Sequence, residues 1–132
     1  MKMLSDLPAP FLSDAGKIQN LVELAKDDGF RGVAIIDSKA GSRRSSHYHR
    51  TDAHRLYVLS GSMLYTERRY GSGTIVKFTV HAGEMVYTPP MVEHWTAFDE
   101  DTRLISISKL SRNHEEHERE LVRVDWIDED PT

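Results

Sequence analysis

From Phe30 onward, hydrophobic residues occur in short runs that glycine and proline interrupt. The runs are GVAIID (32–37), RLYVLSG (55–61), SMLYTERRY (62–70), TIVKFTV (74–80), EMVYTPP (84–90), HWTAF (94–98) and RLISISKL (103–110). Many of their residues are β-branched or aromatic, and turn-forming residues separate them, which is typical of short strands. The pattern therefore predicts an all-β sandwich or barrel.

The segments between and outside these runs complete the prediction. The glycines in 60–62 and 71–73 indicate hairpin turns, so the strands on either side of each are expected to pair antiparallel. Residues 13–26 have hydrophobic positions at helical spacing, which favours a short helix, although a strand or loop is almost equally compatible. Residues 113–120 suit a solvated helix or a loop, and 121–127 predict one more strand. We therefore expect at most one or two short helices.

Size and composition indicate a single domain over residues 1–132, with a barrel over about 30–110 and extensions at both ends that pack on it. The sequence contains no cysteine, which excludes disulfides, thiolate zinc sites, iron–sulfur clusters and cysteine nucleophiles. The formal net charge of −4 is unsuited to non-specific nucleic-acid binding. No apolar run is long enough to span a bilayer, and the first residues lack the apolar region of a secretory signal. We therefore expect a cytoplasmic protein with neither nucleic-acid nor membrane partners.

Four of the seven histidines are placed so that they can converge. His47 and His49 are two positions apart, so in a strand both project from one face. His54 has the same parity as the hydrophobic positions 56 and 58, and His94 follows a Pro-Pro turn. Neutral imidazoles that meet inside an apolar barrel form a site for a divalent transition metal. The other three are expected to be exposed: His81, His114 and His117.

The spacing around the first three of these histidines resembles the first motif of the cupin family. That motif runs glycine, five residues, H-x-H, three or four residues, glutamate, six residues, glycine. Gly41, His47, His49 and Gly61 stand at the matching positions. The one departure is His54, which takes the place of the glutamate.

A later segment is similar to the second cupin motif, which runs glycine, five residues, proline, one residue, glycine, two residues, histidine, three residues, asparagine. Gly83, Pro89 and His94 match this motif, whereas Met91 replaces its second glycine and Phe98 its asparagine. With two motifs in the right order over residues 41–98, the chain is identified as a member of the cupin superfamily.

This resemblance implies an all-β cupin, a double-stranded β-helix (jelly-roll) barrel with one metal ion in its mouth. The implied ligands are His47, His49 and His94, with His54 in the fourth place. Four neutral imidazoles leave a divalent ion with a net charge near +2, whereas a glutamate in the set would leave about +1. We therefore expect a strong Lewis acid that attracts anionic ligands, with zinc, iron, nickel or copper as the metal rather than manganese or magnesium.

A second resemblance concerns the N-terminal segment PAPFLSDAGKIQNL (8–21). Through Phe11, Asp14 and Gly16 it is similar to the opening of the dTDP-4-keto-6-deoxyhexose epimerases and ketoisomerases. That group uses a histidine of the first motif as a base, commonly without metal. The residues that would then receive a diphosphate are Arg43, Arg44 and Arg55. Four clustered imidazoles argue against a metal-free site, because proton transfer needs a single base.

We therefore expect a metal-dependent cupin that acts on a small oxygenated substrate, anionic or enolisable, as a dioxygenase or an isomerase. The alternatives are a nucleotide-sugar epimerase or ketoisomerase and a non-enzymatic ligand-binding cupin. Candidates for the wall of the substrate pocket are Arg43, Tyr65, Tyr87, Met91 and Trp95.

Tyr57 and Leu59 face outward in the expected strand and are more apolar than a solvated face requires. Since small cupins commonly dimerise, we expect a homodimer.

Overall fold

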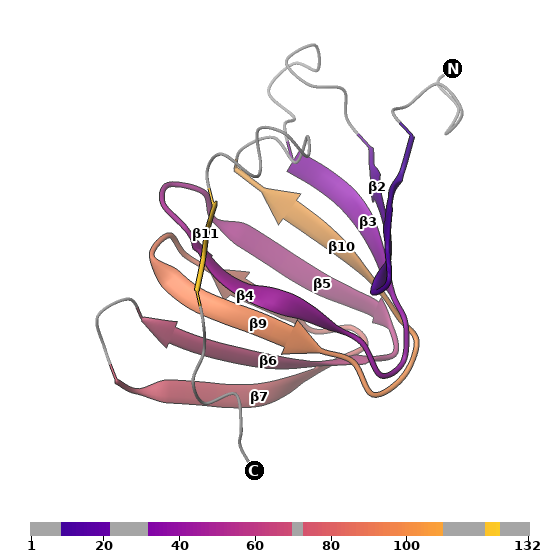
Figure 1. The fold of residues 1–132 in the computed structure, drawn as a ribbon. Helices are drawn as coiled ribbons and strands as arrows, with labels where there is room; N and C mark the ends of the chain where they lie inside the picture. Colours follow the sequence, from indigo (N-terminus) through magenta and orange to yellow (C-terminus); the bar gives the residue numbers. More distant parts are fainter. Residues whose placement is uncertain (1–8, 22–31, 70–72, 110–120, 125–132) are drawn as a thin grey trace.

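The computed structural model describes residues 9–21, 32–69, 73–109 and 121–124, which form eleven strands in two antiparallel sheets (Figure 1). The six-stranded sheet has the order β1 (Phe11–Ser13), β2 (Gly16–Asn20), β3 (Gly32–Ser38), β10 (Thr102–Ser108), β5 (His54–Ser60) and β8 (Met85–Thr88). The five-stranded sheet has the order β11 (Leu121–Arg123), β4 (Arg43–His49), β9 (Val92–Ala97), β6 (Ser62–Arg69) and β7 (Ile75–His81). The prediction of an all-β fold is confirmed. The described residues contain no helix that could cross a membrane.

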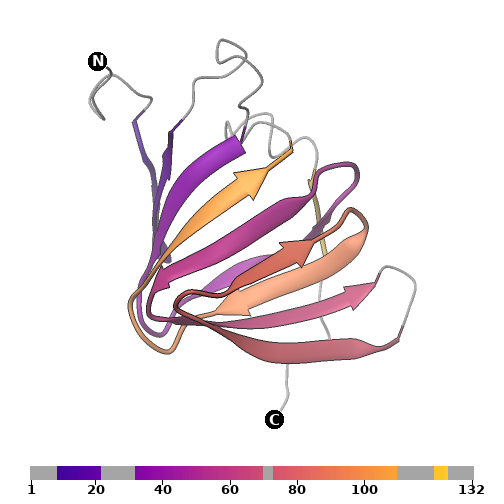
Figure 2. The same ribbon diagram turned by 180° about the vertical axis from the view of Figure 1, so that it is seen from behind.

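The hydrophobic core lies between the two sheets, which face each other in both views of the ribbon (Figures 1 and 2). Strands β3 and β10 alternate buried and less buried positions, as strands with one face on a core do. The buried cluster consists of Ile36, Val58, Met63, Tyr65, Val80, Val86, Phe98 and Leu104. Each predicted run from 32 to 110 corresponds to one strand whose ends differ by a few residues.

The helix expected over residues 13–26 is wrong wherever that segment is described. Residues 11–20 form the antiparallel hairpin β1–β2, which extends the six-stranded sheet by pairing with β3. Gly16 has φ 140°, and a side chain there would collide with the carbonyl oxygen of Asp37. Ile18 of β2 packs against the hydrophobic core. Pairing with β3 therefore outweighs a helical spacing that covers few residues; residues 22–26 lie outside the described part.

The hairpin expected at 60–62 is also wrong, because this turn carries the chain from one sheet to the other. Strand β5 pairs with β10 and β8, whereas β6 belongs to the five-stranded sheet. Gly61 has φ 86°, and a Cβ there would lie 2.5 Å from the carbonyl oxygen of Asp101, so the crossing needs glycine. The antiparallel pairing of β6 with β7 is confirmed, although residues 70–72 of their connection lie outside the described part.

Candidate metal centre

Three histidines of the five-stranded sheet converge on one place. His47 and His49 lie in β4, and His94 lies opposite His47 in the neighbouring strand β9. The ring centroids are 4.8 Å apart for His47 and His49, 4.5 Å for His47 and His94, and 5.7 Å for His49 and His94. One potential ligand atom from each ring lies within 4.8 Å of the other two, so this trio could hold a metal ion.

The orientation of the His94 ring is set by its own strand. Nδ1 of His94 lies 3.0 Å from the carbonyl oxygen of Val92. A carbonyl oxygen can only accept a hydrogen bond, so this contact requires the proton on Nδ1. Nε2 then keeps its lone pair, which is the form of imidazole that binds a metal.

His54 approaches the same cavity from the six-stranded sheet. It begins β5, after residues 50–53 have carried the chain across from β4. Its ring centroid lies 4.2 Å from that of His49, and its Nε2 lies 3.0 Å from Oδ2 of the buried Asp52. His49, Asp52 and His54 form a second group whose ligand atoms lie within 4.8 Å of one another. The structure thus brings the four predicted histidines together as two overlapping groups that share His49.

These histidines line a cavity of about 70 Å³ between the sheets. The lining residues are Ile36, Arg44, His47, His49, His54, Leu56, Thr88, His94, Trp95 and Thr96. A cavity of this size has room for an ion together with a small ligand.

Arg44 brings a positive charge to this cavity. Its Nε and Nη2 donate to Oγ of Ser38 over 3.2 and 3.0 Å, and Nη2 also approaches the carbonyl oxygen of Asp37 at 3.4 Å. Within the described residues, none of these bonds goes to a carboxylate. Burial lowers the pKa of the guanidinium from its ordinary value, because removal from water disfavours the charged form. An anionic ligand in the cavity would compensate this charge.

Tyr65 and Thr88 support the cavity from the core. The two hydroxyl oxygens lie 2.6 Å apart, and both side chains are fully buried. The Tyr65 ring stacks on that of His94 with centroids 6.3 Å apart. Burial raises the pKa of the Tyr65 phenol well above its usual range, so this residue stays neutral next to His94.

The predicted pocket wall is found only in part around this cavity. Trp95 is a lining residue, and the guanidinium of Arg43 lies 5.6 Å from the centre of its ring. Tyr65 lies behind His94, as described above. Tyr87 and Met91 are 47% and 38% exposed and are not among the lining residues.

The three arginines considered for a diphosphate point to three different places. Arg43 lies over Trp95, Arg44 lines the histidine cavity, and the exposed Arg55 lies 4.8 Å from the ring centre of Tyr87. They therefore do not form one anion-binding group in this structure.

Sequence reasoning missed Asp52 and underrated Arg44. Alternation counted back from His47 puts Arg43 on the inner face, but the pairing of β4 with β9 shifts register between Arg44 and His47. Because of this irregularity, the side chains before it point to the opposite face of the strand from the one that alternation predicts. Arg44 therefore lines the cavity. Asp52 stands in the four-residue segment between His49 and His54. Its acidic side chain so close to candidate ligands could have identified it as a further candidate.

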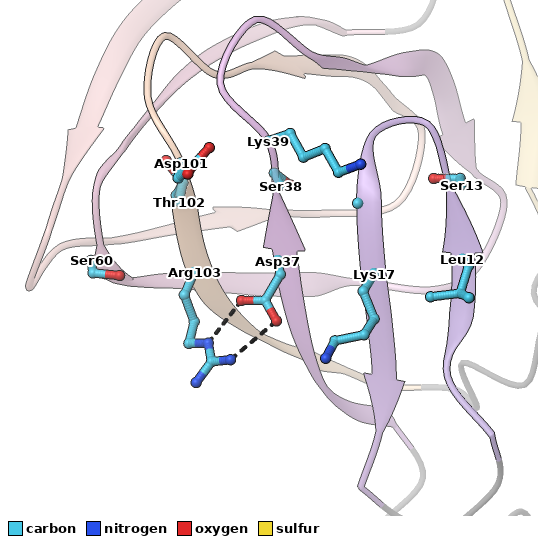
Figure 3. A pocket seen from close by; sticks show the side chains of 11 residues that line it. Leu12, Ser13, Lys17, Asp37, Ser38, Lys39, Ser60, Asp101, Thr102 and Arg103 are labelled. Atoms are coloured by element: carbon cyan, nitrogen blue, oxygen red, sulfur yellow. Dashed lines mark hydrogen bonds and ion pairs between the residues drawn. The ribbon is translucent and has the colours of Figure 1, made fainter.

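A larger hollow of about 650 Å³ shares no residue with the histidine cavity (Figure 3). It lies beside the β1–β2 hairpin and contains the ion pair of Asp37 with Arg103, with Lys17 and Lys39 close by. The described residues that line it include no histidine, and neither group of potential metal ligands lies there.

The donor set of the smaller cavity fits a transition metal. Imidazole nitrogens are common ligands of zinc, iron, nickel and copper, and a neighbouring carboxylate is compatible with each of them. When bound there, such an ion supplies a Lewis acid that polarises an oxygen atom of a ligand. The chain itself supplies the ring orientation at His94 and the positive charge at Arg44.

Solved structures similar to this one are cupins. The capsular polysaccharide assembling protein CapF from Staphylococcus aureus matches with a TM-score of 0.74 and 20% identity, over 93% of this chain and 38% of its own. Bacillus subtilis oxalate decarboxylase, studied for its Mn(II) centres, matches with a TM-score of 0.70 and 21% identity, over 89% and 30%. The Drosophila melanogaster CENP-C structure with bound CAL1 matches with a TM-score of 0.65 and 16% identity, over 78% and 76%. The cupin fold is thereby confirmed, and the chain spans about two fifths of the length of CapF.

No curated protein sequence matches the chain. A family model described as the polysaccharide biosynthesis C-terminal domain matches residues 15–119, which is most of the chain and includes both histidine segments. The protein therefore belongs to the polysaccharide biosynthesis C-terminal domain family and has the cupin fold.

Proposed function

We propose that this protein is a metal-dependent cupin whose ion is held by His47, His49 and His94, with His54 as the fourth histidine. The observation that carries the proposal is the convergence of the first three rings, whose potential ligand atoms lie within 4.8 Å of one another. The fixed tautomer of His94 supports it, because it leaves the lone pair on Nε2, the form of imidazole that binds a metal. A nitrogen-rich set favours zinc, iron, nickel or copper.

Metal analysis of protein purified without an affinity tag tests this function. We expect about one transition-metal ion per chain, since the cavity has room for one. Protein that stays free of metal after incubation with each of the four ions and removal of excess would contradict the proposal.

We propose further that the ligand is small, oxygenated and anionic, either a carboxylate or an enolate. Arg44 supports this class, because a half-buried cation next to a bound divalent ion is stabilised by an anion. The cavity volume of about 70 Å³ supports a small ligand. The reaction would then be an oxygenation or an isomerisation of an enolisable substrate.

Two measurements separate these outcomes. Oxygen uptake by the metal-loaded protein with a β-diketone selects the dioxygenase, whereas proton exchange without oxygen uptake selects the isomerase. In a binding titration with malonate, Arg44→Gln should weaken affinity at least about tenfold, the scale of one charge-assisted bond. Arg43→Gln is the matched control, and an equal loss in both variants would contradict the role of Arg44.

A second candidate is a nucleotide-sugar epimerase or ketoisomerase that uses a motif histidine, His47 or His49, as its base. The family match and the similarity to CapF favour it, because both printed descriptions concern polysaccharide formation. The separation of Arg43, Arg44 and Arg55 speaks against a diphosphate site made by these residues. Deuterium incorporation into a 4-keto nucleotide sugar by chelator-treated protein would select this candidate.

A third candidate is a cupin that binds a ligand or a protein without catalysis. The similarity to the CENP-C structure with bound CAL1 favours it. A metal-loaded protein that binds malonate but turns over neither a β-diketone nor a keto sugar would support this candidate.

We also propose that the chain forms a homodimer through the exposed side of β5, β8 and β10. These strands are neighbours in the six-stranded sheet. Their large hydrophobic residues with at least a third of the surface exposed are Tyr57, Leu59, Met85, Tyr87 and Ile107. Burial of this patch against a second copy of the chain would stabilise the dimer through the hydrophobic effect.

Light scattering coupled to gel filtration tests the dimer. Leu59→Lys is expected to produce monomers, while Val76→Lys, an equally exposed position on β7 of the other sheet, should leave the dimer intact. A monomeric parent protein at about 50 µM, well above a micromolar Kd, would contradict the proposal.

A further inference from the structure

Within the described residues, Asp52 is the one carboxylate in the two groups of potential metal ligands, where it stands with His49 and His54. It belongs to the loop that carries the chain from β4 to β5, and its side chain is 1% exposed. The first cupin motif has its glutamate at position 54, where this chain has histidine. An acidic side chain is nevertheless present, two residues earlier.

The two oxygens of Asp52 face different groups. Oδ1 accepts the backbone N–H of Ala53 at 2.8 Å and that of Lys109 at 2.9 Å, which anchors the carboxylate to the end of β10. Oδ2 points the other way and lies 3.0 Å from Nε2 of His54. The anchored carboxylate is therefore held with its other oxygen beside His54.

The spacing of these atoms suits neighbouring ligands of one ion. Two ligands at about 2.1 Å from a metal and at a right angle to each other lie about 3.0 Å apart. Oδ2 of Asp52 and Nε2 of His54 have this separation, and a ligand atom of His49 lies within 4.8 Å of both. Two imidazoles and one carboxylate are a donor set that holds ferrous iron and other divalent ions.

We propose that Asp52 is a metal ligand through Oδ2 and supplies the carboxylate that the substitution at position 54 removed. This inference rests on the metal-binding function proposed above. With Asp52 in the donor set, a divalent ion carries a net charge near +1, as in the glutamate-containing motif. The cavity then differs from the four-imidazole site that the sequence predicts, because its ion is less electrophilic and accepts an oxygen donor.

Asp52→Asn is a sharp test, because the amide keeps a carbonyl oxygen for the N–H groups of Ala53 and Lys109 while it removes the charged ligand oxygen. Asp101→Asn is the matched control, since Oδ1 of Asp101 likewise accepts a backbone N–H, that of Ala40 at 2.9 Å. Asp101 lines the hollow beside the N-terminal hairpin and is no part of the histidine cavity.

Co²⁺ titrations of the full chain, followed by the visible spectrum, provide the readout. Asp52→Asn is expected to raise the Kd for Co²⁺ by more than about 100-fold and to shift the visible bands, because loss of a direct ligand exceeds the 10–100-fold cost of losing an outer contact. Asp101→Asn should bind as the parent does. An unchanged visible spectrum, together with a rise in the Kd for Co²⁺ smaller than about 100-fold, would overturn the inference, because Asp52 would then act only by holding His54.

A crystal structure of the Co²⁺-loaded parent protein tests the same point if the Asp52→Asn variant does not fold. Oδ2 at about 2.0–2.2 Å from the ion supports the inference, and a separation above about 3 Å overturns it. A parent protein that binds no Co²⁺ rejects the metal-binding function, whereas one that binds Co²⁺ without Asp52 rejects this inference alone.

Discussion

The backbone N–H of Met91 donates a hydrogen bond to the carbonyl oxygen of His49 over 2.8 Å. This bond ties the turn before β9 to the strand that carries two of the candidate ligands. Met91 stands where the second cupin motif has glycine, and its φ of 64° lies in the left-handed region. Met91 thus adopts the left-handed backbone conformation that favours glycine, and this conformation is strained for methionine.

Met91→Gly is expected to raise the free energy of unfolding by up to about 1 kcal/mol. Glycine removes about 1–2 kcal/mol of left-handed strain, and its greater flexibility in the unfolded chain offsets part of this gain. Met91→Val should lower the same free energy by about 1 kcal/mol or more, because a β-branched residue tolerates this conformation poorly. Urea denaturation measures both changes, and a glycine variant less stable than the parent would contradict the argument.

His49→Ala is expected to remove stoichiometric metal, because His49 belongs to both groups of potential ligands. Metal content should fall from about one ion per chain to nearly none. His81→Ala is the control, since His81 is exposed and belongs to neither group. Elemental analysis after gel filtration decides the matter, and retention of metal by the His49 variant would rule out this site.

Tyr65→Phe is expected to cost about 1–2 kcal/mol of folding free energy. The substitution leaves the buried hydroxyl of Thr88 without the partner it has at 2.6 Å, and an unmade buried hydrogen bond carries this cost. Thr88→Val should restore part of the loss in the double variant, because both polar groups are then absent. Denaturation of the four proteins yields the coupling energy, and strictly additive losses would show that the two hydroxyls do not interact.

The ion pair of Asp37 with Arg103 predicts a contribution to stability that disappears in acid. Hydrogen bonds of 2.8 and 3.2 Å from Arg103 lower the pKa of the Asp37 carboxyl below its ordinary value of 3.8. The folded state therefore holds its proton less tightly than the unfolded state. The contribution is present above the ordinary pKa and is lost as pH falls through the lowered one.

Asp37→Asn should accordingly be less stable than the parent at pH 7, by a small margin because both side chains are partly exposed to solvent. The difference should shrink in high salt and disappear as the pH falls below the lowered pKa of Asp37. Thermal unfolding at several pH values follows it, and a difference independent of pH would mean that charge is not its origin.

The sequence by itself determined the strands and most of the candidate ligands. Alternation and turn residues are local properties, and between residues 32 and 108 they placed every strand except β4 to within a few positions. The two-residue spacing of His47 and His49 likewise put both rings on one face without any tertiary information.

Only the tertiary structure decided how these elements meet. The chain changes sheet at Gly61 and again through residues 50–53, so His54 faces His49 from across the barrel and brings Asp52 with it. The register shift in β4 turned Arg44, instead of Arg43, toward the cavity. Pairing with β3 made a hairpin of a segment with helical spacing. Each of these outcomes depends on contacts between residues far apart in the chain, which local periodicity does not encode.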